Sequence, residues 1–513
     1  MGLLIEECML EGKRPGSVYI EGGTIVRISD SPTQTVPNGT PRVEANGGSL
    51  FAGFTDTHCH PFEYGWLKRN VDLRGTSNLT GLRMRLSSRV QRTPPGEWVT
   101  GMGWDQETFA EGRMPTRHDI DDIAPRNPVA LMRVCGHVAL LNSRAVETLA
   151  FEGRRGEEFE RDGAGALTGI VKEGAVAEAL ARVPRSVQSC SQALQSVEVE
   201  AMRYGITRIH CIVSPEGFVQ ELDALGQLQT EGSLSINYRV YIPPEALTFV
   251  EDRGLRGKLA GDRVRIMGVK VYADGSLGAS TAALREPYAD DPSNTGILRH
   301  TDAELSEIVD RADRAGLQVI VHAIGDRAVE QAVGALSRVT GAKNPRRHRI
   351  EHASLLPRDL RNQMARHAIR ATVQPLFITS DTWALKRLGE ERVHDLYPLR
   401  SMMADGITAS GSSDAPVESL SPLLGMWAAM VRGGYAPEEA LSFDHALKLY
   451  TEGACSNGFD EVGSTLAEGS RANLTLLYSN VEGMHPAMLR KVEVAATIIE
   501  GLVGYSRTGV DSI

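Results

Sequence analysis

The chain has 513 residues, of which 65 are acidic and 55 are basic, so its formal net charge is −10. A chain of this charge lacks the basic surface that binds nucleic-acid phosphates, and we expect no nucleic-acid partner. No apolar run approaches the roughly 20 residues that span a bilayer, and residues 1–10 lack the basic segment typical of a signal peptide. We therefore expect no membrane partner and a cytoplasmic location. The six cysteines are scattered without a CxxC pair, and in such a protein we expect reduced thiols.

The N-terminal 51 residues read as short strands broken by glycine and proline turns. The segment GSVYIEGGTIVRIS (16–29) is typical of a hairpin with a Gly-Gly turn. Two C-terminal segments, ANLTLLYS (472–479) and VEVAATIIEGLVGY (492–505), are also rich in strand-forming residues. Because chain ends often lie close together, we predict one small β-sandwich domain built from residues 1–51 and 456–513.

Between these ends, apolar strand-like runs alternate with amphipathic helix-like stretches. Successive examples are DRVRIMGVKVYADG (262–275), TDAELSEIVDRADRAG (301–316), LQVIVHAIGD (317–326) and RAVEQAVGALSRVTG (327–341). This alternation is typical of βα units on a parallel sheet, and it predicts the α/β fold class with a (β/α)8 TIM-like barrel over residues 52–455. The stretch at about 75–260 is too long for simple βα repeats, so we predict an insertion subdomain there.

Polar residues end several of the predicted strands. His58 and His60 close the apolar run SLFAGFTDTH, and side chains two apart on a strand share one face. Four further candidates stand at or near the ends of later runs: Lys270, His322, His352 and Asp414. Active sites of such barrels lie at the carboxyl ends of the strands, so this recurrence indicates one shared site.

Taken singly, each of these residues has a structural explanation. His322 could be a core histidine, Lys270 a lysine that reaches solvent and Asp414 a cap or turn residue. Taken together, four neutral imidazoles and a carboxylate match zinc or another first-row divalent ion. A lysine ammonium cannot bind a cation, but a carbamate on Lys270 would supply two oxygens and bridge two ions. Such a pair makes a hydroxide and polarises a carbonyl, while Asp414 could bind one ion and move the proton.

In this order the six residues resemble the amidohydrolase superfamily. Its pattern is HxH on the first strand, a carboxylated lysine on the fourth, histidines on the fifth and sixth, and an aspartate on the eighth. More narrowly, four segments resemble the amidohydrolase family 3 branch of YtcJ-like proteins and N-substituted formamide deformylases: VKVYADGSLGASTAAL (269–284), HAIGDRAV (322–329), RIEHASLL (349–356) and SGSSDAPV (410–417). The sequence departs from the family pattern at Ala52 and Asn473, where proline and aspartate are usual, and neither position belongs to the candidate metal set.

The resemblance implies a hydrolase with two divalent ions, with zinc as the expected metal and carbamylated Lys270 as the bridging ligand. Attack of a metal-bound hydroxide would cleave an amide, N-acyl or N-formyl C–N bond of a small-molecule substrate, and Asp414 would protonate the leaving nitrogen. In the motif-rich stretch 103–146, His137, Trp104 and Asp105 are candidate substrate contacts. Asp274 in ADGS is a further candidate at the rim of the site. The structural alternatives are a loop histidine without a role at His137 and a turn at Asp274.

Other functions remain open at this point. A mononuclear deaminase of the same superfamily commonly has a glutamate three residues after the fifth-strand histidine, whereas Gly325 stands there. The second alternative is a ligand-binding regulatory protein with a structural metal, although a structural zinc site is closed by four ligands. The same metal site could also serve an isomerase or a lactonase. The substrate cannot be read from the sequence, and a homodimer is possible.

Overall fold

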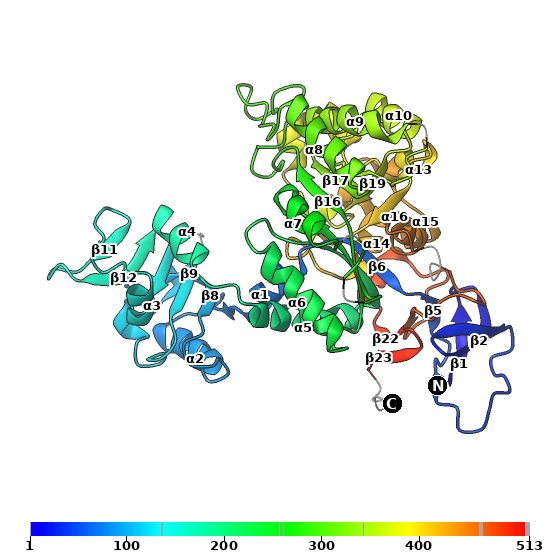
Figure 1. Cartoon of the computed structure of the whole chain (residues 1–513), viewed down its shortest axis with the longest axis horizontal. Coiled ribbons are helices and arrows are strands. Elements are labelled where there is room, and N and C mark those ends of the chain that lie inside the picture. Colours follow the sequence, from blue (N-terminus) through cyan, green and yellow to red (C-terminus); the bar gives the residue numbers. More distant parts are fainter. Residues whose placement is uncertain are drawn as a thin grey trace. The chain divides into compact units, whose positions relative to one another are not determined.

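The computed structural model describes residues 2–134, 137–255, 257–259, 261–341, 343–460 and 465–507. The chain divides into two compact units (Figure 1), and each is described here by itself. The first unit comprises Met1–Tyr64 and Leu194–Ile513, and the second comprises Gly65–Ala193.

The first unit contains the predicted barrel. Within the described residues, eight parallel strands follow one another in sheet order as they do in the chain. They are β6 (Phe54–Cys59), β13 (Ile206–Ile212), β14 (Asn237–Ile242), β16 (Val264–Tyr272), β17 (Gln318–Ala323), β18 (Arg349–His352), β19 (Arg370–Val373) and β20 (Ala409–Gly411). The first and last strands meet where Thr57 Oγ1 donates to the Gly411 carbonyl over 2.9 Å. The expectation of a (β/α)8 TIM-like barrel is therefore confirmed.

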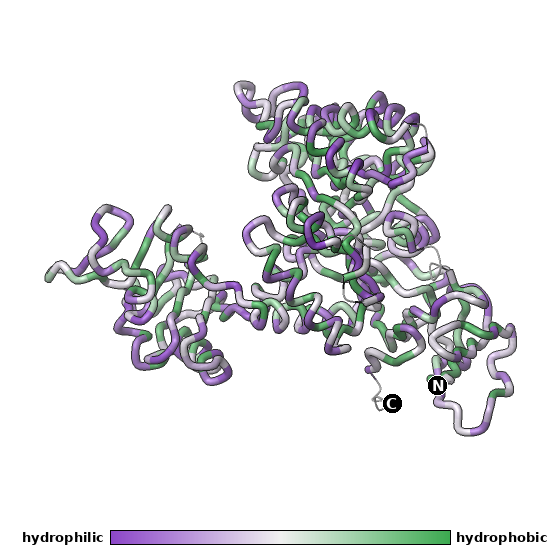
Figure 2. The backbone as a smooth tube through the Cα atoms, in the orientation of Figure 1, coloured by the Kyte–Doolittle hydropathy of each residue, from purple (hydrophilic) through white to green (hydrophobic). Residues whose placement is uncertain are grey.

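The barrel strands are apolar because both of their faces are covered. In β17 the run QVIVHA is almost wholly buried, with the sheet neighbours on either side and helices outside. Figure 1 shows α8 and α9 beside this part of the sheet, and Figure 2 shows apolar stretches through the interior with hydrophilic ones in the outer turns. The helices of this unit are α6 (Phe218–Thr230), α7 (Leu247–Asp252), α8 (Asp302–Arg314), α9 (Asp326–Thr340), α10 (Arg358–Arg366), α11 (Phe377–Ser380), α12 (Ala384–Arg392), α13 (Leu399–Ala404), α14 (Pro422–Val431), α15 (Phe443–Tyr450) and α16 (Glu452–Asn457). A short strand, β15 (Gly257–Lys258), pairs antiparallel with β16.

Strands from both chain ends form one mixed sheet, as expected. Its order is β23-β22-β21-β5-β1-β2-β3, and β4 also pairs with β1. The strands are β1 (Gly2–Leu10), β2 (Arg14–Glu21), β3 (Thr24–Ser29), β4 (Arg42–Glu44), β5 (Ser49–Ala52), β21 (Leu474–Leu477), β22 (Val494–Ile499) and β23 (Leu502–Ser506). An isolated bridge from Thr24 to Arg471 also joins the N-terminal and C-terminal segments, which share one apolar core. Residues 461–464 and 508–513 of the predicted domain lie outside the described residues.

The second unit is built on a separate mixed sheet. Its order is β11-β12-β10-β9-β8-β7, and two apolar cores pack against it. The strands are β7 (Val71–Asp72), β8 (Val99–Trp104), β9 (Val129–Arg133), β10 (Val138–Leu141), β11 (Phe159–Arg161) and β12 (Leu167–Lys172). The helices are α2 (Leu79–Val90), α3 (Ser143–Thr148) and α4 (Gly174–Ala181), while α1 (Pro61–Arg69) and α5 (Val187–Arg203) cross the unit boundaries.

The inserted unit is shorter than the sequence indicated. We expected an insertion at about 75–260, but β13 and β14 lie within that range and are the second and third strands of the barrel. Their apolar pattern is interrupted because Arg208, His210 and Arg239 are buried inside the barrel. Because of these polar residues, the hydrophobic pattern did not predict the two strands.

Two expectations from composition can be compared with the described residues. Cys135 lies outside the described residues. The other five cysteines are buried free thiols: Cys8, Cys59, Cys190, Cys211 and Cys455. Among the described helices, none combines the length and apolar character needed to cross a membrane.

Candidate metal centre

Three groups with lone pairs crowd together at the carboxyl ends of β6 and β20. His58 Nε2 and His60 Nε2 each lie 3.3 Å from Asp414 Oδ1. One ligand atom from each residue fits within 4.8 Å of the others, which makes this trio a candidate metal site. Asp414 holds a left-handed backbone conformation with φ 56°, and its N–H donates to the His58 carbonyl over 2.9 Å. Backbone strain of this kind is tolerated where the surrounding structure fixes it, often at functional sites.

Lys270 reaches the same cluster from β16. Its Nζ lies 3.3 Å from His58 Nε2 and 4.7 Å from the ring centre of Tyr272. The side chain is buried, and burial lowers the pKa of its amine from 10.5 to about 8. A larger fraction of this amine than of an ordinary lysine is therefore uncharged near neutral pH.

His322 and His352 complete the cluster from β17 and β18. The ring centres of His58 and His352 are 5.2 Å apart, and those of His322 and His352 are 4.4 Å apart. His352 also has a left-handed backbone conformation, with φ 70°. The structure thus brings all six side chains of the sequence prediction together, although the part each plays toward a metal stays a prediction.

The protonation states at this site favour a cation. Burial lowers the pKa of His58 to about 4 and that of His322 to about 3, so both rings are neutral at pH 7. Burial also holds the pKa of His352 well below its ordinary value. For Asp414, burial acts to raise the pKa, but the nearby His58, His60 and His352 outweigh it and keep the pKa below its usual range. Neutral imidazoles beside an ionised carboxylate are the donor set of a zinc or similar site.

For His58, His352 and His322, one ring nitrogen has a hydrogen-bond partner within the barrel unit. His58 Nδ1 contacts the Glu351 carboxylate, and His352 Nδ1 lies 2.8 Å from Gln374 Oε1. His322 Nε2 lies 2.9 Å from the Gly275 carbonyl, which leaves its Nδ1 for the site. Partners of this kind fix ring orientation and tautomer in metal sites.

Sequence reasoning missed two of the buried acids around the histidines. Glu351 precedes His352 in β18, and Asp56 accepts hydrogen bonds from the His58 N–H and from Ser413. Burial raises the pKa of Asp56 to about 7. Both acids sit within fully buried strands, and an ionisable residue inside a strand predicted to be buried is the signal that could have found them.

Asp274 lies at the site but faces the protein interior. Its Oδ2 accepts the N–H groups of Ala283 and Gly325, both over 2.9 Å, and its Oδ1 accepts the Ile324 N–H over 3.1 Å. The side chain is fully buried, and burial raises its pKa to about 7. These contacts tie the loop after β16 to the loop after β17, so Asp274 holds the neighbourhood of His322 in place and offers no free oxygen to a substrate.

The other three predicted substrate contacts belong to the second unit. Trp104 is fully buried in its core, and the indole N–H donates to the Leu131 carbonyl over 2.7 Å. Asp105 forms a 2.7 Å ion pair with Arg133. His137 is exposed, with Nδ1 3.1 Å from Glu173 Oε2. Trp104 thus serves the packing of its own unit, whereas substrate contact by Asp105 or His137 stays a prediction.

Fold and site together define a class of protein: a (β/α)8 barrel with histidines, a buried lysine and an aspartate gathered at the carboxyl ends of its strands. A profile described as the amidohydrolase family matches residues 42–505. The putative amidohydrolase YtcJ of Bacillus subtilis (strain 168) is 31% identical and covers 99% of this chain and 99% of its own length. The chain therefore belongs to the amidohydrolase family, as the sequence resemblance predicted.

Further similarities agree in fold. An N-substituted formamide deformylase from Arthrobacter pascens is 24% identical over 96% of this chain and 95% of its own. Among solved structures, an uncharacterized metal-dependent hydrolase from Pyrococcus furiosus has a TM-score of 0.79 at 31% identity, covering 93% of this chain and 98% of that one. A 5-methylcytosine deaminase from Klebsiella pneumoniae has a TM-score of 0.53 at 15% identity over 99% and 98% of the two chains, a likeness of fold alone.

Proposed function

We propose that the protein is a metal-dependent amidohydrolase that hydrolyses an amide, N-acyl or N-formyl C–N bond in a small-molecule substrate. The observation that carries the proposal is the trio of His58, His60 and Asp414, whose potential ligand atoms lie within 4.8 Å of one another. Groups with lone pairs repel at such distances unless a proton or a cation lies between them. Two divalent ions, with zinc as the expected metal, fit the six side chains gathered there.

The chain's own residues would hold such ions in a graded environment. The His58 side chain is 1% exposed, whereas His60 is 21% and Asp414 is 12% exposed. His58 would therefore bind from the closed side, while His60 and Asp414 border the side from which a substrate approaches. When bound, the metal ions supply Lewis acidity toward a carbonyl oxygen and lower the pKa of water.

Lys270 is proposed to act as a carbamate. Its uncharged amine would attack carbon dioxide, form an N–C bond and release one proton, leaving an anionic group with two oxygens. The lowered pKa of the buried amine supports this reaction, because the ammonium form has no lone pair for it. A carbamate at this place would have His58 Nε2 beside it, since the Lys270 nitrogen already lies 3.3 Å away.

Asp414 is proposed to carry the proton. Its Oδ1 faces the two histidines, and the side chain keeps enough exposure to meet a substrate with its other oxygen. That carboxylate would take a proton from the attacking water and deliver it to the leaving nitrogen, so that an amine departs and a carboxylic acid remains. The similarity to the putative amidohydrolase YtcJ and to the N-substituted formamide deformylase supports the same reaction class.

Metal analysis and substrate screening test this proposal together. The full chain should contain two divalent ions and should release free amine from members of a panel of N-acyl and N-formyl amines. A chelator should abolish the release and zinc should restore it. Amine release that survives complete metal removal would overturn the proposal. Ammonia release from amino-heterocycles with one ion and an unmodified Lys270 would favour the deaminase alternative.

The carbamate has its own test. Incubation with 13C-labelled bicarbonate should give a carbamate carbon signal in the NMR spectrum of the full chain, and Lys270→Ala should lack it. A wild-type spectrum without the signal at full metal occupancy would remove the bridging ligand from the proposal and leave the hydrolase reaction to the other five residues.

A further inference from the structure

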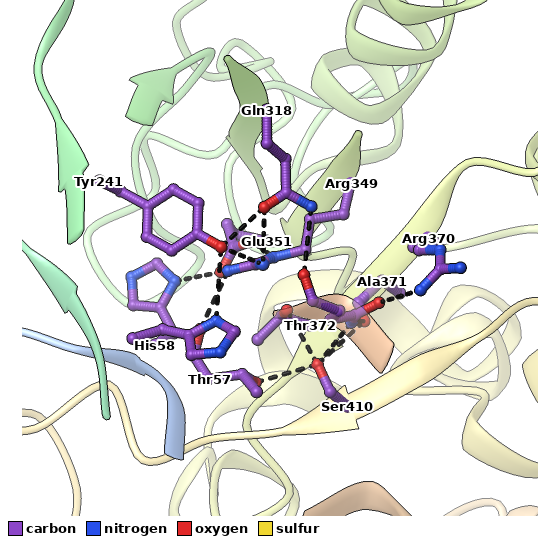
Figure 3. A network of polar contacts seen from close by, with 12 residues as sticks. Thr57, His58, Tyr241, Gln318, Arg349, Glu351, Arg370, Ala371, Thr372 and Ser410 are labelled. Carbon is purple, nitrogen blue, oxygen red and sulfur yellow. Dashed lines mark hydrogen bonds and ion pairs between the residues drawn. The ribbon is translucent and has the colours of Figure 1, made fainter. Parts of the chain in front are cut away.

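A buried hydrogen-bonded chain runs from the candidate metal centre toward the opposite end of the barrel (Figure 3). One oxygen of Glu351 contacts His58 Nδ1, and the other accepts from Arg349 Nε over 2.6 Å. Resting on the proposed function, we propose that Glu351 is a positioning residue that fixes the tautomer and orientation of His58, and that Arg349 holds Glu351 in place for this task.

Arg349 is itself held from two further sides. One terminal nitrogen donates to the Tyr241 hydroxyl over 2.9 Å, and the other donates to the Thr57 carbonyl over 3.1 Å. The side chains of Glu351 and Arg349 are both 0% exposed. Thr57 directly precedes His58. The guanidinium therefore binds the backbone of β6, and the Glu351 carboxylate binds the histidine side chain of the same strand. The histidine is thereby fixed at both its backbone and its ring.

The direction of each hydrogen bond follows from chemistry. A guanidinium stays protonated in proteins, so Arg349 can only donate to Glu351. An ionised carboxylate can only accept, so His58 Nδ1 must carry a hydrogen and donate to Glu351. In the neutral ring the lone pair is then on Nε2, which points at Asp414 and Lys270. The network therefore selects the one tautomer of His58 that can bind a metal in this site.

Comparison with the other histidines shows what is special about His58. The partner of His352 Nδ1 is the neutral amide of Gln374. His322 Nε2 has the Gly275 carbonyl at 2.9 Å and the Asp274 carboxylate farther away, at 3.4 Å. An anionic acceptor forms a stronger hydrogen bond than a neutral one and leaves more electron density on the metal-facing nitrogen. We therefore expect His58 to be the strongest of these three histidine ligands and Glu351 to be responsible for the difference.

A purely structural role explains the pair less well. Burying an arginine and a glutamate costs desolvation that their mutual attraction often fails to offset, and apolar residues of similar size would serve the barrel interior as well. The contact with His58 Nδ1 explains why a carboxylate, and not an apolar side chain, stands at this position. Gln318 extends the chain by accepting the Tyr241 hydroxyl over 2.7 Å, so Arg349 has an oriented acceptor.

Zinc affinity of the metal-free full chain tests the proposal without requiring a known substrate. Glu351→Gln keeps the size of the side chain but removes the charge, and its amide can donate to His58 Nδ1 and favour the wrong tautomer. Zinc titration against a chromophoric chelator should show about 10- to 100-fold weaker binding of the first ion. Because Glu351→Gln strands a buried guanidinium, the double variant with Arg349→Met removes both charges and should show the same loss with a better-preserved fold.

Asp460→Asn is the matched control, because it breaks another buried ion pair of the barrel, with Arg239, that touches none of the six candidate ligands. Its folded fraction should bind zinc like the parent. Parent-like zinc affinity in folded Glu351→Gln and in the double variant would overturn the proposal. Loss of the fold in both would also overturn it, since the pair would then belong to the barrel core. A parent chain that binds no zinc at all would instead refute the proposed function.

Discussion

The two ends of the barrel both bury polar side chains, but they do so in opposite ways. At the carboxyl ends of the strands, the potential ligand atoms of His58, His60 and Asp414 lie within 4.8 Å of one another. Toward the amino ends, Asp460 accepts hydrogen bonds from Arg239 and lies 3.1 Å from Arg208. The first cluster gathers three groups that can each offer a ligand atom to a metal, whereas the second pairs an acid with two guanidinium groups.

The C-terminal end of α16 adds further hydrogen bonds at this end of the barrel. Asn457 donates to the Ala371 carbonyl over 3.1 Å and to Ser410 Oγ over 2.7 Å, while Arg370 donates to Ser456 Oγ over 2.9 Å. The chain thus closes the amino-terminal end of the barrel with its own groups. Buried polar groups are usually hydrogen-bonded, so a cluster of acids paired with guanidinium groups fits a structural role, whereas a cluster of metal-ligand groups fits the proposed cation.

The largest expected effect is a loss of activity on substitution of Asp414, at the carboxyl ends of the strands. Asp414→Asn removes a ligand and the proposed proton carrier, so kcat/KM on any substrate found in the screen should fall on the order of 1,000-fold or more. The free energy of unfolding of the metal-free chain should change little, because the substitution relieves opposed lone pairs. Steady-state kinetics and denaturant unfolding measure the two quantities. Unchanged kcat/KM at full metal content would contradict the assignment.

Asp460→Asn should show the reverse. The substitution leaves two buried guanidiniums without their carboxylate, and breaking a buried ion pair in this way costs about 3 to 5 kcal/mol of unfolding free energy. The folded fraction should keep the kcat/KM of the parent, because the candidate metal centre lies at the other strand ends. A large loss of kcat/KM in chains shown to be folded would mean that the two ends are coupled more closely than the hydrogen bonds indicate.

The candidate metal centre could be predicted from the sequence because its residues stand at recurring positions. His58, His322 and Asp414 each follow an apolar run, and the barrel architecture itself brings strand ends together. Each residue was ambiguous alone, and only their common place in successive βα units made a site. The fold class followed from the same alternation of strands and helices.

The other end could not be predicted because its residues interrupt the apolar pattern instead of ending it. Arg208 and Arg239 lie inside β13 and β14. Because these polar residues break the apolar pattern, both strands were assigned to the predicted insertion. Their partner Asp460 lies more than 200 residues away in the sequence. Glu351 was missed for a similar reason, since its partner His58 lies on another strand. Such pairings depend on tertiary contacts that a single sequence does not display.

Glu198 provides a smaller, pH-dependent comparison with Asp460. It lies in α5 near the start of β14, where its hydrogen bonds come from neutral donors: the N–H groups of Ser235 and Ile236 and the Tyr238 hydroxyl. Burial raises the pKa of Glu198 from 4.5 to about 7. The folded state therefore holds this proton more tightly than the unfolded state. The resulting stabilisation is present below pH 4.5 and is lost as the pH rises toward 7.

Glu198→Gln removes this titration. Between pH 5 and 8, the free energy of unfolding of the parent should fall by on the order of 2 kcal/mol more than that of the variant, since each pKa unit corresponds to about 1.4 kcal/mol. Urea unfolding at several pH values gives both curves. Parallel curves would show that the acid titrates normally in the folded chain and that its neutral donors stabilise the charge as well as guanidiniums do.

The smallest expected effect lies outside both buried clusters. Thr301 begins α8 with a capping box, in which its hydroxyl accepts the Glu304 N–H over 3.3 Å and the Glu304 carboxylate accepts the Thr301 N–H over 2.8 Å. Thr301→Ala should lower the free energy of unfolding by about 1 kcal/mol and leave kcat/KM and zinc affinity unchanged. Thr301→Ser, which keeps the hydroxyl, should stay close to the parent. A Thr301→Ala loss as large as that of Asp460→Asn would mean that helix α8, and not the buried charge pairing, limits the stability of the barrel.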